Sequence, residues 1–425
     1  MRIVVWGTGR TGLDTAREMI RQGHEVRLVD EKVPRQSGEL PVSLLKEDDM
    51  KWADLVIPSP GIPRFHSMLG CAKKVLSEIE VAARLLTGTL IAVTGSNGKT
   101  TTTTLIHRIL TRAGLDAGIG GNISPPLISL VERNPQYIVA EISSFQLEWI
   151  EHFRPRIGIC LNITPDHLDR YRDMDEYVFY KKIMFRNQQE DDIAVLNAAD
   201  PYLRTVEGRA RRVGFSFNPP SSGDGAFLEG SRVCFQGSIA GQGPMLPEGR
   251  DLGNGLKEDM LVSALVARLL GVDSSISQEV FADFEGIHHR FEHVATIDGV
   301  SFVDDSKATN VGALETALSG MRGPVILILG GKDKGGDFSH IARRFSDRIR
   351  MVIAIGEAAG RIVQEVSDIV DAEYASDMEQ AVKTAFKRAA SGDTVLLSPG
   401  CASFDMFQSY AHRGEVFRQC VHSIR

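Results

Sequence analysis

The chain has 425 residues, of which 43% are hydrophobic, and a net charge of −7. This length predicts two or three domains. The acidic balance and the lack of Lys/Arg runs argue against a nucleic-acid partner. No apolar stretch approaches the ~20 residues that cross a bilayer, and the N-terminus lacks a signal-peptide pattern. Five scattered cysteines without a CxxC pair indicate a cytoplasmic protein rather than a disulfide framework or a zinc site.

The first segment carries a dinucleotide-type fingerprint. Residues 2–6 predict a buried strand, residues 7–12 read GTGRTG, and a helix is expected from about 13 to 22. A second strand over residues 25–29 then ends at Asp30, the acidic position of the fingerprint. Because this fold specifies a phosphate-binding crevice and not hydride chemistry, any nucleotide diphosphate is a candidate ligand. Asp30 is expected to hold a ribose or a base edge.

A further strand over residues 53–58 is followed by the turn SPGIP at residues 59–63. This turn falls where a ligand crevice forms, although an ordinary connecting loop explains it equally well. Residues 73–86 predict a helix. We place the first domain boundary after residue 77.

The segment from Leu90 to Leu110 predicts a phosphate loop. A short apolar strand at residues 91–93 enters a glycine-rich turn, and a helical pattern follows. Backbone N–H groups and the helix dipole at such a turn attract phosphates. The turn and the helix start contain Gly95, Ser96, Asn97, Gly98, Lys99, Thr100 and Thr101. Lys99 is expected on the β/γ-phosphates and the Thr100 hydroxyl on Mg²⁺, although Val93 stands where the full Walker A pattern has glycine.

Polar residues follow the next two predicted strands of the central region. Glu141 follows the strand over residues 137–140, where a Mg²⁺ ligand is needed; the alternative is a carboxylate stabilised by a helix start. The second strand, over residues 157–162, leads into Asp166 and His167 of a D-H-x-D cluster. These groups can converge on metal, phosphate or a substrate amine.

The predicted helix over residues 175–187 contains two adjacent lysines. Apolar and aromatic neighbours of Lys181 predict a partly buried amine, which has a lowered pKa; Lys182 is the alternative. A glycine-, serine- and proline-rich segment over residues 214–251 predicts either a small β excursion or exposed loops. A helix over residues 260–270 follows, and the domain ends at residue 286.

The last region predicts another doubly wound α/β domain, over residues 287–425. Four short strands each end in a polar, glycine-rich segment, and such segments meet at one crevice of a parallel sheet. They read DDSKATN at 304–310, GGKDKGG at 330–336, GE at 356–357 and SPGCASFD at 398–405. Lys307, Lys334 and Arg290 are the cations available for an acidic substrate or for phosphates.

These segments together resemble the Mur ligase family over all three predicted domains. The motifs that carry the resemblance are TGSNGKTT, GGN at 120–122, EISSFQLE at 141–148, LNITPDHLDRY, HHRFE at 288–292, DDSKATN, GGKDKGGDF and SPGCASFDMF. SSFQLE and DSKATN best distinguish the branches of this family from one another, and both are similar to the corresponding motifs of the branch that adds D-glutamate. The resemblance implies an α/β protein of three domains: an N-terminal Rossmann-like domain (1–77), a central P-loop-type ATPase domain (78–286) and a C-terminal Rossmann-like domain (287–425).

The resemblance also implies an activity. It is the ATP-dependent joining of D-glutamate to UDP-N-acetylmuramoyl-L-alanine through an acyl phosphate, in cytoplasmic peptidoglycan precursor synthesis. In-line phosphoryl transfer of this kind needs Mg²⁺ and lysine clamps on the developing charge. The implied cofactors are ATP and Mg²⁺, the latter at two sites. The implied partners are small-molecule substrates, and we expect a monomer.

The resemblance also implies a role for each residue that matches a family motif. Catalysis is assigned to Lys99, Glu141, His167 and Lys181. Metal binding is assigned to Thr100, Glu141, His167 and Lys181, the last as a carbamate. ATP is assigned to residues 95–101 with Arg290 and Asp305. The UDP-linked substrate is assigned to Gly9, Arg10, Thr11, Asp30, Glu31, Lys32, Gly61, Asn122 and Ser143. D-glutamate is assigned to Asp166, Lys307, Thr309, Lys334, Ser403 and Tyr410.

Three positions depart from the family pattern. Residues 257–263, KEDMLVS, replace a stretch in which the family uses two asparagines on the nucleotide, so the family's adenine contacts are not carried over to this stretch. Lys32 replaces an arginine and loses its bidentate fork, and Tyr410 replaces a phenylalanine. The alternatives are a related ligase for another amino acid such as L-glutamate, a nicotinamide-dependent oxidoreductase built on residues 7–12, and a non-catalytic nucleotide-binding scaffold.

Overall fold

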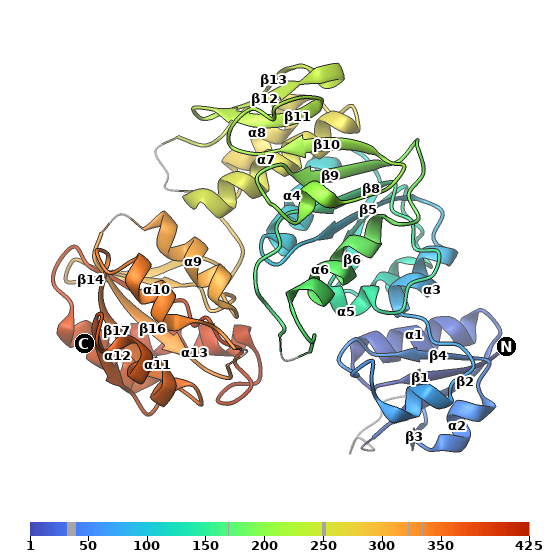
Figure 1. The fold of residues 1–425 in the computed structure, drawn as a ribbon, viewed down its shortest axis with the longest axis horizontal. Coiled ribbons are helices and arrows are strands. Elements are labelled where there is room, and N and C mark those ends of the chain that lie inside the picture. Colours follow the sequence, from blue (N-terminus) through green and yellow to red (C-terminus); the bar gives the residue numbers. More distant parts are fainter. Residues whose placement is uncertain (32–39, 169, 249–251, 322, 334, 425) are drawn as a thin grey trace. The chain divides into compact units, whose positions relative to one another are not determined.

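The computed structural model describes residues 1–31, 40–168, 170–248, 252–321, 323–333 and 335–424, and shows a mixed α/β fold with three sheets (Figure 1). Its chain forms two compact units. The first contains residues 1–163, 175–247 and 259–282, and the second contains residues 164–174, 248–258 and 283–425. Among the described residues, no helix has the length and apolar character needed to cross a bilayer.

The first sheet has four parallel strands in the order β3-β2-β1-β4. Its strands are β1 (Arg2–Trp6), β2 (Glu25–Asp30), β3 (Val42–Leu44) and β4 (Leu55–Pro58). Its helices are α1 (Arg10–Arg21) and α2 (Glu47–Trp52), with the 3₁₀ turn η1 (Ser67–Cys71). A continuous apolar strand is typical of a sheet covered on both faces, and residues 3–6 of β1 are indeed buried.

The second sheet has nine strands in the order β13-β12-β11-β10-β9-β8-β5-β7-β6. The parallel strands are β5 (Thr89–Thr94), β6 (Ala117–Gly121), β7 (Tyr137–Glu141), β8 (Ile157–Cys160), β9 (Ile193–Asn197), β10 (Arg211–Phe215) and β11 (Asp224–Glu229). Two antiparallel strands, β12 (Arg232–Gln236) and β13 (Gly241–Met245), extend the sheet, which confirms the predicted β excursion.

Helices and short 3₁₀ turns connect these strands. The helices are α3 (Glu78–Leu85), α4 (Lys99–Arg112), α5 (Ser144–Leu147), α6 (Met174–Lys182), α7 (Gly253–Leu269) and α8 (Ser274–Ala282). The 3₁₀ turns are η2 (Leu127–Leu130), η3 (Ile183–Phe185), η4 (Leu203–Thr205) and η5 (Gly237–Ile239). Strand β5 lies between β7 and β8, so the turn after β5 lies at the edge where these neighbouring strands also end.

The third sheet has six strands in the order β14-β15-β19-β16-β17-β18, and only β14 is antiparallel. Its strands are β14 (Glu292–Ile297), β15 (Val300–Asp304), β16 (Val325–Gly330), β17 (Ile349–Ile355), β18 (Asp371–Tyr374) and β19 (Thr394–Leu397). Its helices are α9 (Val311–Gly320), α10 (Phe338–Arg344), α11 (Ala359–Val366), α12 (Met378–Arg388) and α13 (Tyr410–His422). Two apolar clusters cover the two faces of this sheet, so the predicted α/β class is confirmed.

Some predicted elements were wrong in extent. The helix expected over residues 73–86 begins only at Glu78, because residues 74–76 are extended beside β4: Val56 N donates to Lys74 O (2.9 Å), and Leu76 N donates to Val56 O (3.1 Å). Helix α7 begins seven residues earlier than expected. Strands β14 and β18 were not expected, because both are partly exposed and contain charged residues instead of a continuous apolar run. The predicted boundaries after residues 77 and 286 stay a prediction.

Candidate active site

The phosphate loop lies between β5 and α4 in the first unit. Gly98 has a φ of +86°, and a β-carbon there would lie 2.4 Å from Asp259 Oδ1, so glycine is required on both grounds. Asn162 holds the loop from the end of β8. Its Oδ1 accepts a hydrogen bond from Asn97 N (2.8 Å), and its Nδ2 donates to Asn97 O (3.2 Å). Asn162 thus fixes the loop at the N-terminus of α4, where the first N–H groups of a helix lack intrahelical partners.

Lys99 is the first residue of α4 and folds back over this loop. Its Nζ donates hydrogen bonds to Gly95 O (2.8 Å) and Ser96 O (2.9 Å). Thr100 and Thr101 are buried on the same first turn of α4. The predicted cation and hydroxyl therefore both lie at the loop that is expected to hold the phosphates.

Glu141 is the last residue of β7, and only 3% of it is exposed. Its Oε1 accepts a hydrogen bond from Asn122 Nδ2 (2.7 Å). Its Oε2 is buried and has no hydrogen-bond partner among the residues that the structure describes. A buried carboxylate oxygen left without a partner is costly unless a cation or another donor reaches it, so the donor set fits Mg²⁺, which prefers such oxygens.

Lys181 is 1% exposed and lies on α6. Its Nζ donates a hydrogen bond to Gly95 O (2.9 Å) and lies 4.7 Å from the ring centroid of Tyr177. The hydroxyl of Tyr177 lies 2.9 Å from Ser96 Oγ. Lys182, in contrast, donates to Thr205 Oγ1 (2.7 Å). The structure therefore brings Lys181, and not Lys182, to the phosphate loop.

Two residues at this loop were not predicted as site residues. Asn162 lies in the LNITPDH segment directly after a strand, so its position at the sheet edge was a usable signal. Asp259 on α7 accepts a hydrogen bond from Thr102 Oγ1 (2.9 Å) and is 5% exposed. It belongs to the segment 257–263 that departs from the family pattern, and no local signal predicts its contact with α4.

Asp30 is hydrogen-bonded to the glycine-rich turn at residues 7–12. Its Oδ2 accepts hydrogen bonds from Thr8 N and Thr8 Oγ1, both at 2.8 Å. A β-carbon on Gly12 would lie 1.9 Å from Gly7 O, so only glycine allows α1 to approach the turn. Asp30 thus holds the turn itself, and its contact with a ribose or base stays a prediction.

The other residues predicted for the UDP moiety are spread around this turn. Gly9 caps α1, Thr11 lies on its first turn, and Arg10 donates to Ser124 Oγ. Glu31 Oε1 lies 3.2 Å from His66 Nε2. Gly61 lies in the turn closed by the hydrogen bond from Ile62 N to Ser59 O (3.0 Å). Lys32 lies outside the described residues.

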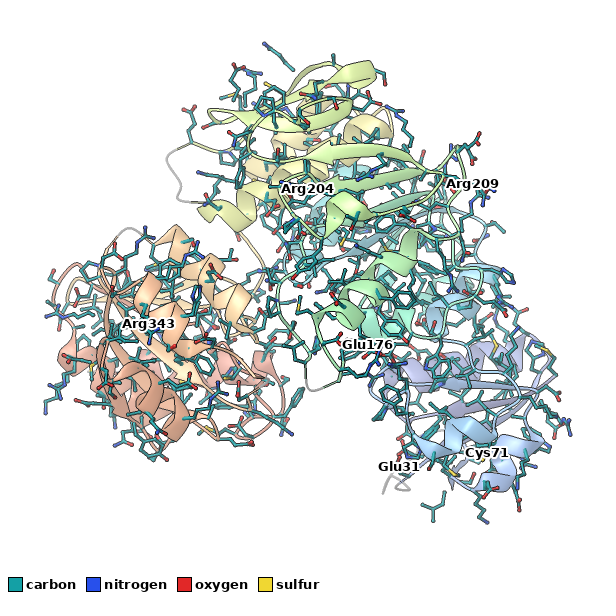
Figure 2. The ribbon with its side chains drawn as sticks, in the orientation of Figure 1. Glu31, Cys71, Glu176, Arg204, Arg209 and Arg343 are labelled. Carbon is teal, nitrogen blue, oxygen red and sulfur yellow. The ribbon has the colours of Figure 1, made fainter. Side chains whose placement is uncertain are left out.

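An ion pair connects this first sheet region with the central one. Arg64, just after the Gly61 turn, pairs with Glu176 of α6, and its guanidinium lies 3.9 Å from the Phe65 ring centroid (Glu176 is labelled in Figure 2). Ser143 caps α5: its hydroxyl accepts from Gln146 N (3.4 Å) and donates to Gln146 Oε1 (3.1 Å). Arg64 is therefore a neighbour of the Gly61 turn that the sequence motifs did not single out.

The second unit contains Asp166 and His167. Asp166 Oδ2 accepts a hydrogen bond from Asn310 Nδ2 (2.9 Å), and Asp166 Oδ1 accepts from His167 N (2.9 Å). Asn310 also caps α9, since its side chain accepts from Ala313 N (2.8 Å). Asp166 is therefore joined to the DDSKATN segment at 304–310, and its role toward the amino acid stays a prediction.

Asp305 is buried at the end of β15. Its Oδ2 accepts a hydrogen bond from Ser398 Oγ (2.8 Å). Burial raises the pKa of this carboxyl to about 7, although the Ser398 hydroxyl and the charge of Arg290 both favour the ionised form. The structure thus brings the two residues predicted for the adenosine end of ATP near each other.

Lys307 and Tyr410 also lie together. Lys307 Nζ is 5.1 Å from the ring centroid of Tyr410, and Ser306 Oγ donates to Tyr410 O (2.9 Å). The buried Arg413 connects the segment at 304–310 with the segment at 398–405. Its guanidinium donates to Ser306 O (2.8 Å) and to Cys401 O (3.1 Å). Ser403 is buried and Thr309 is half-buried, whereas Lys334 lies outside the described residues.

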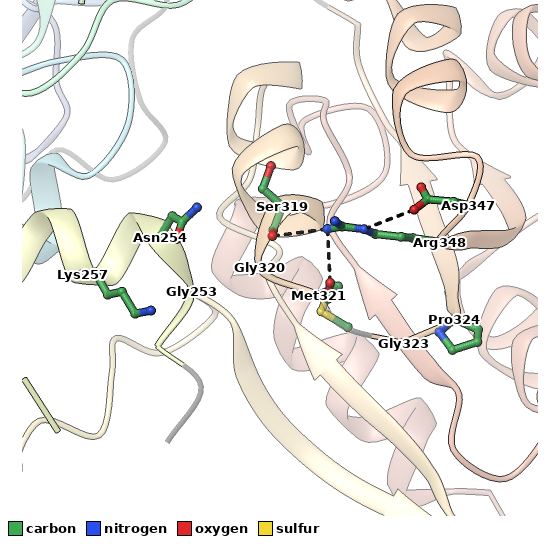
Figure 3. Close-up of a pocket in the computed structure, with 10 residues that line it drawn as sticks. All are labelled: Gly253, Asn254, Lys257, Ser319, Gly320, Met321, Gly323, Pro324, Asp347 and Arg348. Atoms are coloured by element: carbon green, nitrogen blue, oxygen red, sulfur yellow. Dashed lines mark hydrogen bonds and ion pairs between the residues drawn. The ribbon is translucent and has the colours of Figure 1, made fainter. Parts of the chain in front are cut away.

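A separate pocket of about 510 Å³ opens in the second unit (Figure 3). It is lined by Gly253, Asn254, Lys257, Ser319, Gly320, Met321, Gly323, Pro324, Asp347 and Arg348. Arg348 Nη1 donates to Leu318 O, Ser319 O and Met321 O (3.0–3.3 Å). Because this guanidinium already caps the carboxyl end of α9, it is less available to a ligand.

The chain matches two family models. Residues 93–228 match the Mur ligase middle domain, and residues 289–401 match the glutamate ligase domain of Mur ligases. The UDP-N-acetylmuramoylalanine–D-glutamate ligase of Geobacter metallireducens is 38% identical over 99% of this chain and 97% of its own length. The same-named protein of Syntrophotalea carbinolica is 39% identical over 100% and 98%.

Solved structures share the fold at low sequence identity. A pseudomurein peptide ligase type C from Methanothermus fervidus aligns over the full length of both chains, with a TM-score of 0.66 and 19% identity. The MurF ligase of Thermotoga maritima, solved in complex with ADP, aligns over 100% of this chain and 95% of its own, with a TM-score of 0.62 and 18% identity.

Proposed function

The chain belongs to the Mur ligase family, and we propose that it joins D-glutamate to UDP-N-acetylmuramoyl-L-alanine at the expense of ATP. The observation that carries this proposal is the match to D-glutamate ligases over at least 97% of both chains. The structure supports it with a phosphate loop that has Lys99 and Lys181 on the same carbonyl oxygen, that of Gly95.

The reaction has two steps. The substrate carboxylate attacks the γ-phosphorus of ATP, which forms the acyl phosphate and releases ADP. The D-glutamate amine then attacks the acyl carbon, and the tetrahedral intermediate expels phosphate as the amide forms. Catalysis of the first step depends on positioning and on cations at the phosphoryl oxygens. We assign that role to Lys99, and we assign the remaining phosphate oxygens to the N–H groups at the start of α4.

The divalent metal that family members use would be held in part by Glu141, because its Oε2 is buried and unpaired among the described residues. Thr100, His167 and a carbamate on Lys181 are the further ligands that we propose, at two sites. Bound Mg²⁺ supplies charge neutralisation at the phosphates. Asn122 holds the other oxygen of Glu141 and so orients the carboxylate.

The remaining proposed residues bind the three substrates. We propose that Gly9, Arg10, Thr11, Asp30, Glu31, Lys32, Gly61, Asn122 and Ser143 bind the UDP-linked substrate. We propose that Arg290 and Asp305 bind the adenosine end of ATP. D-glutamate is assigned to Asp166, Lys307, Thr309, Lys334, Ser403 and Tyr410. Among the described residues of this last set, Lys307 supplies the cation for its carboxylates. We also propose a cytoplasmic monomer.

A nicotinamide-dependent oxidoreductase is disfavoured by family membership. It also leaves the buried Glu141 carboxylate and the buried Lys181 without a role. The fingerprint at residues 7–12 is assigned instead to the diphosphate of the UDP-linked substrate, since backbone N–H groups at a helix start bind any diphosphate.

The experiment that tests the proposal is ATP-dependent phosphate release with UDP-N-acetylmuramoyl-L-alanine. D-Glu, L-Glu, L-Lys and diaminopimelate are added separately, and the product is identified by mass spectrometry. Release with D-Glu alone is expected. Phosphate release with a different amino acid would support the same mechanism but with that amino acid as the substrate. No phosphate release with any of the four would refute the proposal.

A further inference from the structure

A hydrogen-bonded cluster lies directly beside the proposed adenosine residues. His289 Nδ1 is 2.8 Å from Oδ2 of the fully buried Asp304, and His289 N donates to Glu292 Oε2 (2.9 Å). Three such side chains resemble a metal centre. However, Glu292 also pairs with Arg418, and Asp304 and His289 already contact each other, so the cluster is satisfied without an ion.

The backbone at His289 is strained. Its φ is +64°, and it lies in a turn closed by the hydrogen bond from Arg290 N to Ile287 O (3.0 Å). Turn positions with positive φ favour Gly or Asn, because a β-carbon is crowded there. Histidine is one of the residues that tolerate this conformation, and here its ring is directed onto Asp304 (2.8 Å), which is the observation that points to a role for the side chain.

The pair connects the turn at 287–290 with the segment at 304–310. His289 O accepts a hydrogen bond from Lys307 N (3.0 Å), and Asp304 Oδ1 accepts from Ser306 N (2.8 Å). Together with the side-chain contact between His289 and Asp304, these bonds fix the backbone on both sides of Asp305. They also fix the residue that precedes Arg290.

A glycine on α13 leaves room for this pair. A β-carbon on Gly414 would lie 2.2 Å from His289 Nδ1, 2.4 Å from Asp304 Oδ2 and 2.6 Å from Ser306 Oγ. Glycine weakens a helix interior relative to alanine. Its presence in α13 is therefore explained by the space that the pair occupies.

We propose that His289 and Asp304 form a positioning pair that sets Arg290 and Asp305 for the adenosine end of ATP and Lys307 for the amino acid. The pair acts through these neighbours and needs no contact with a substrate. The inference rests on the proposed function, because that function assigns ATP and D-glutamate to those three residues.

Three variants and one control test it. H289G removes the side chain but relieves the backbone strain, so it separates positioning from folding. H289N also tolerates positive φ and keeps an amide that can bond to Asp304. G414A pushes a methyl group into the pair from another helix. H288A, at the exposed neighbouring histidine, is the control.

We measure KM for ATP and for the UDP-linked substrate, kcat, and the thermal unfolding midpoint. H289G and G414A are expected to raise KM for ATP by roughly tenfold or more, since small misplacements of binding groups have effects of this size. KM for the UDP-linked substrate, whose proposed residues all lie in the first unit, is expected to change less than twofold, that is, by under ~0.4 kcal/mol. H289N is expected to recover most of the loss, and H288A to match the parent chain.

An unchanged KM for ATP in H289G would overturn the inference. So would equal defects in H289G and H289N that follow a common drop in the unfolding midpoint, because that result describes a structural role. Hydrogen exchange over residues 304–310 gives a readout that does not need the reaction. Faster exchange in H289G than in H288A supports the pair even if the parent chain proves inactive with D-Glu, and equal exchange refutes it.

Discussion

Lys181 Nζ lies 2.9 Å from the carbonyl oxygen of Gly95, a residue 86 positions earlier in the chain. Lys99 Nζ lies 2.8 Å from the same oxygen. Two lysine side chains therefore converge on one carbonyl of the phosphate loop. Because like charges repel at short range, this arrangement is best suited to an anion at the loop, or to conversion of one amine into a group without positive charge.

This relationship predicts the effect of replacing Lys181. K181M is expected to lower phosphate release by about 100-fold, a size typical for loss of one preorganised electrostatic group. K182M is the matched control, since Lys182 contacts Thr205 instead, and is expected to retain activity. Formation of the carbamate can be followed by carbon-13 NMR with carbon-13-labelled bicarbonate. A labelled signal that survives in K181M would contradict the assignment of the carbamate to Lys181.

Replacing Glu141 is expected to separate metal dependence from stability. E141Q removes the charge of a carboxylate that has one buried oxygen without a partner in the described part of the chain. The Mg²⁺ concentration for half-maximal phosphate release is expected to rise roughly tenfold or more, because a charged oxygen ligand is lost. The unfolding midpoint without metal is expected to stay equal or to rise, since an unpaired buried charge opposes folding. E132Q, at an exposed position, is the control, and a lower midpoint in E141Q alone would contradict this reading.

Glu78 predicts a pH-dependent loss of stability. It is 2% exposed, its Oε1 accepts from Ile128 N (2.6 Å), and burial raises its pKa to about 7 from 4.5. The folded chain thus binds this proton more tightly than the unfolded chain. The contribution of Glu78 to stability therefore falls as pH rises from about 4.5 to about 7, and then stays at its lower value.

E78Q is expected to remove this effect and keep the acceptor for Ile128 N. Its unfolding midpoint is expected to match the parent chain near pH 4.5 and to exceed it by several degrees at pH 8. The corresponding free energy is about 3 kcal/mol at most, from the size of the pKa shift. Thermal scans at the two pH values measure the difference. A variant that is less stable than the parent chain at pH 8 would show that the buried charge is compensated.

Asp305 predicts that ATP binding depends on pH. Burial raises its pKa to about 7, so the carboxylate forms as pH rises through 7. If that anion accepts hydrogen bonds from the adenosine end of ATP, KM for ATP falls between pH 6 and pH 8. D305N is expected to bind ATP more weakly and to lose this dependence. S398A removes the hydroxyl that favours the ionised form, so its transition is expected at higher pH.

D298N, at an exposed aspartate in a turn with positive φ, is the control for this series. It is expected to show the pH profile of the parent chain. Equal profiles in D305N and D298N would assign the pH dependence to another group.

The phosphate loop, the ends of β5, β7, β15 and β19, and the α/β class were predictable from the sequence. Each of them is encoded locally: an apolar strand, a glycine turn and a helix start follow one another within about ten residues, and buried parallel strands place their carboxyl ends at one edge. Glu141 and Asp305 could be found for the same reason, because Glu141 is the last residue of an apolar strand and Asp305 directly follows one.

Only the tertiary structure decided which of two adjacent lysines reaches the phosphate loop, since helix α6 turns by about 100° per residue and its orientation depends on the packing of Tyr177. The contact of Asp259 with Thr102, and the space that Gly414 leaves for His289 and Asp304, also join residues from distant segments. Residues 74–76 are extended because β4 offers them backbone partners. Contacts of this kind depend on how separate elements pack, and no local pattern records them.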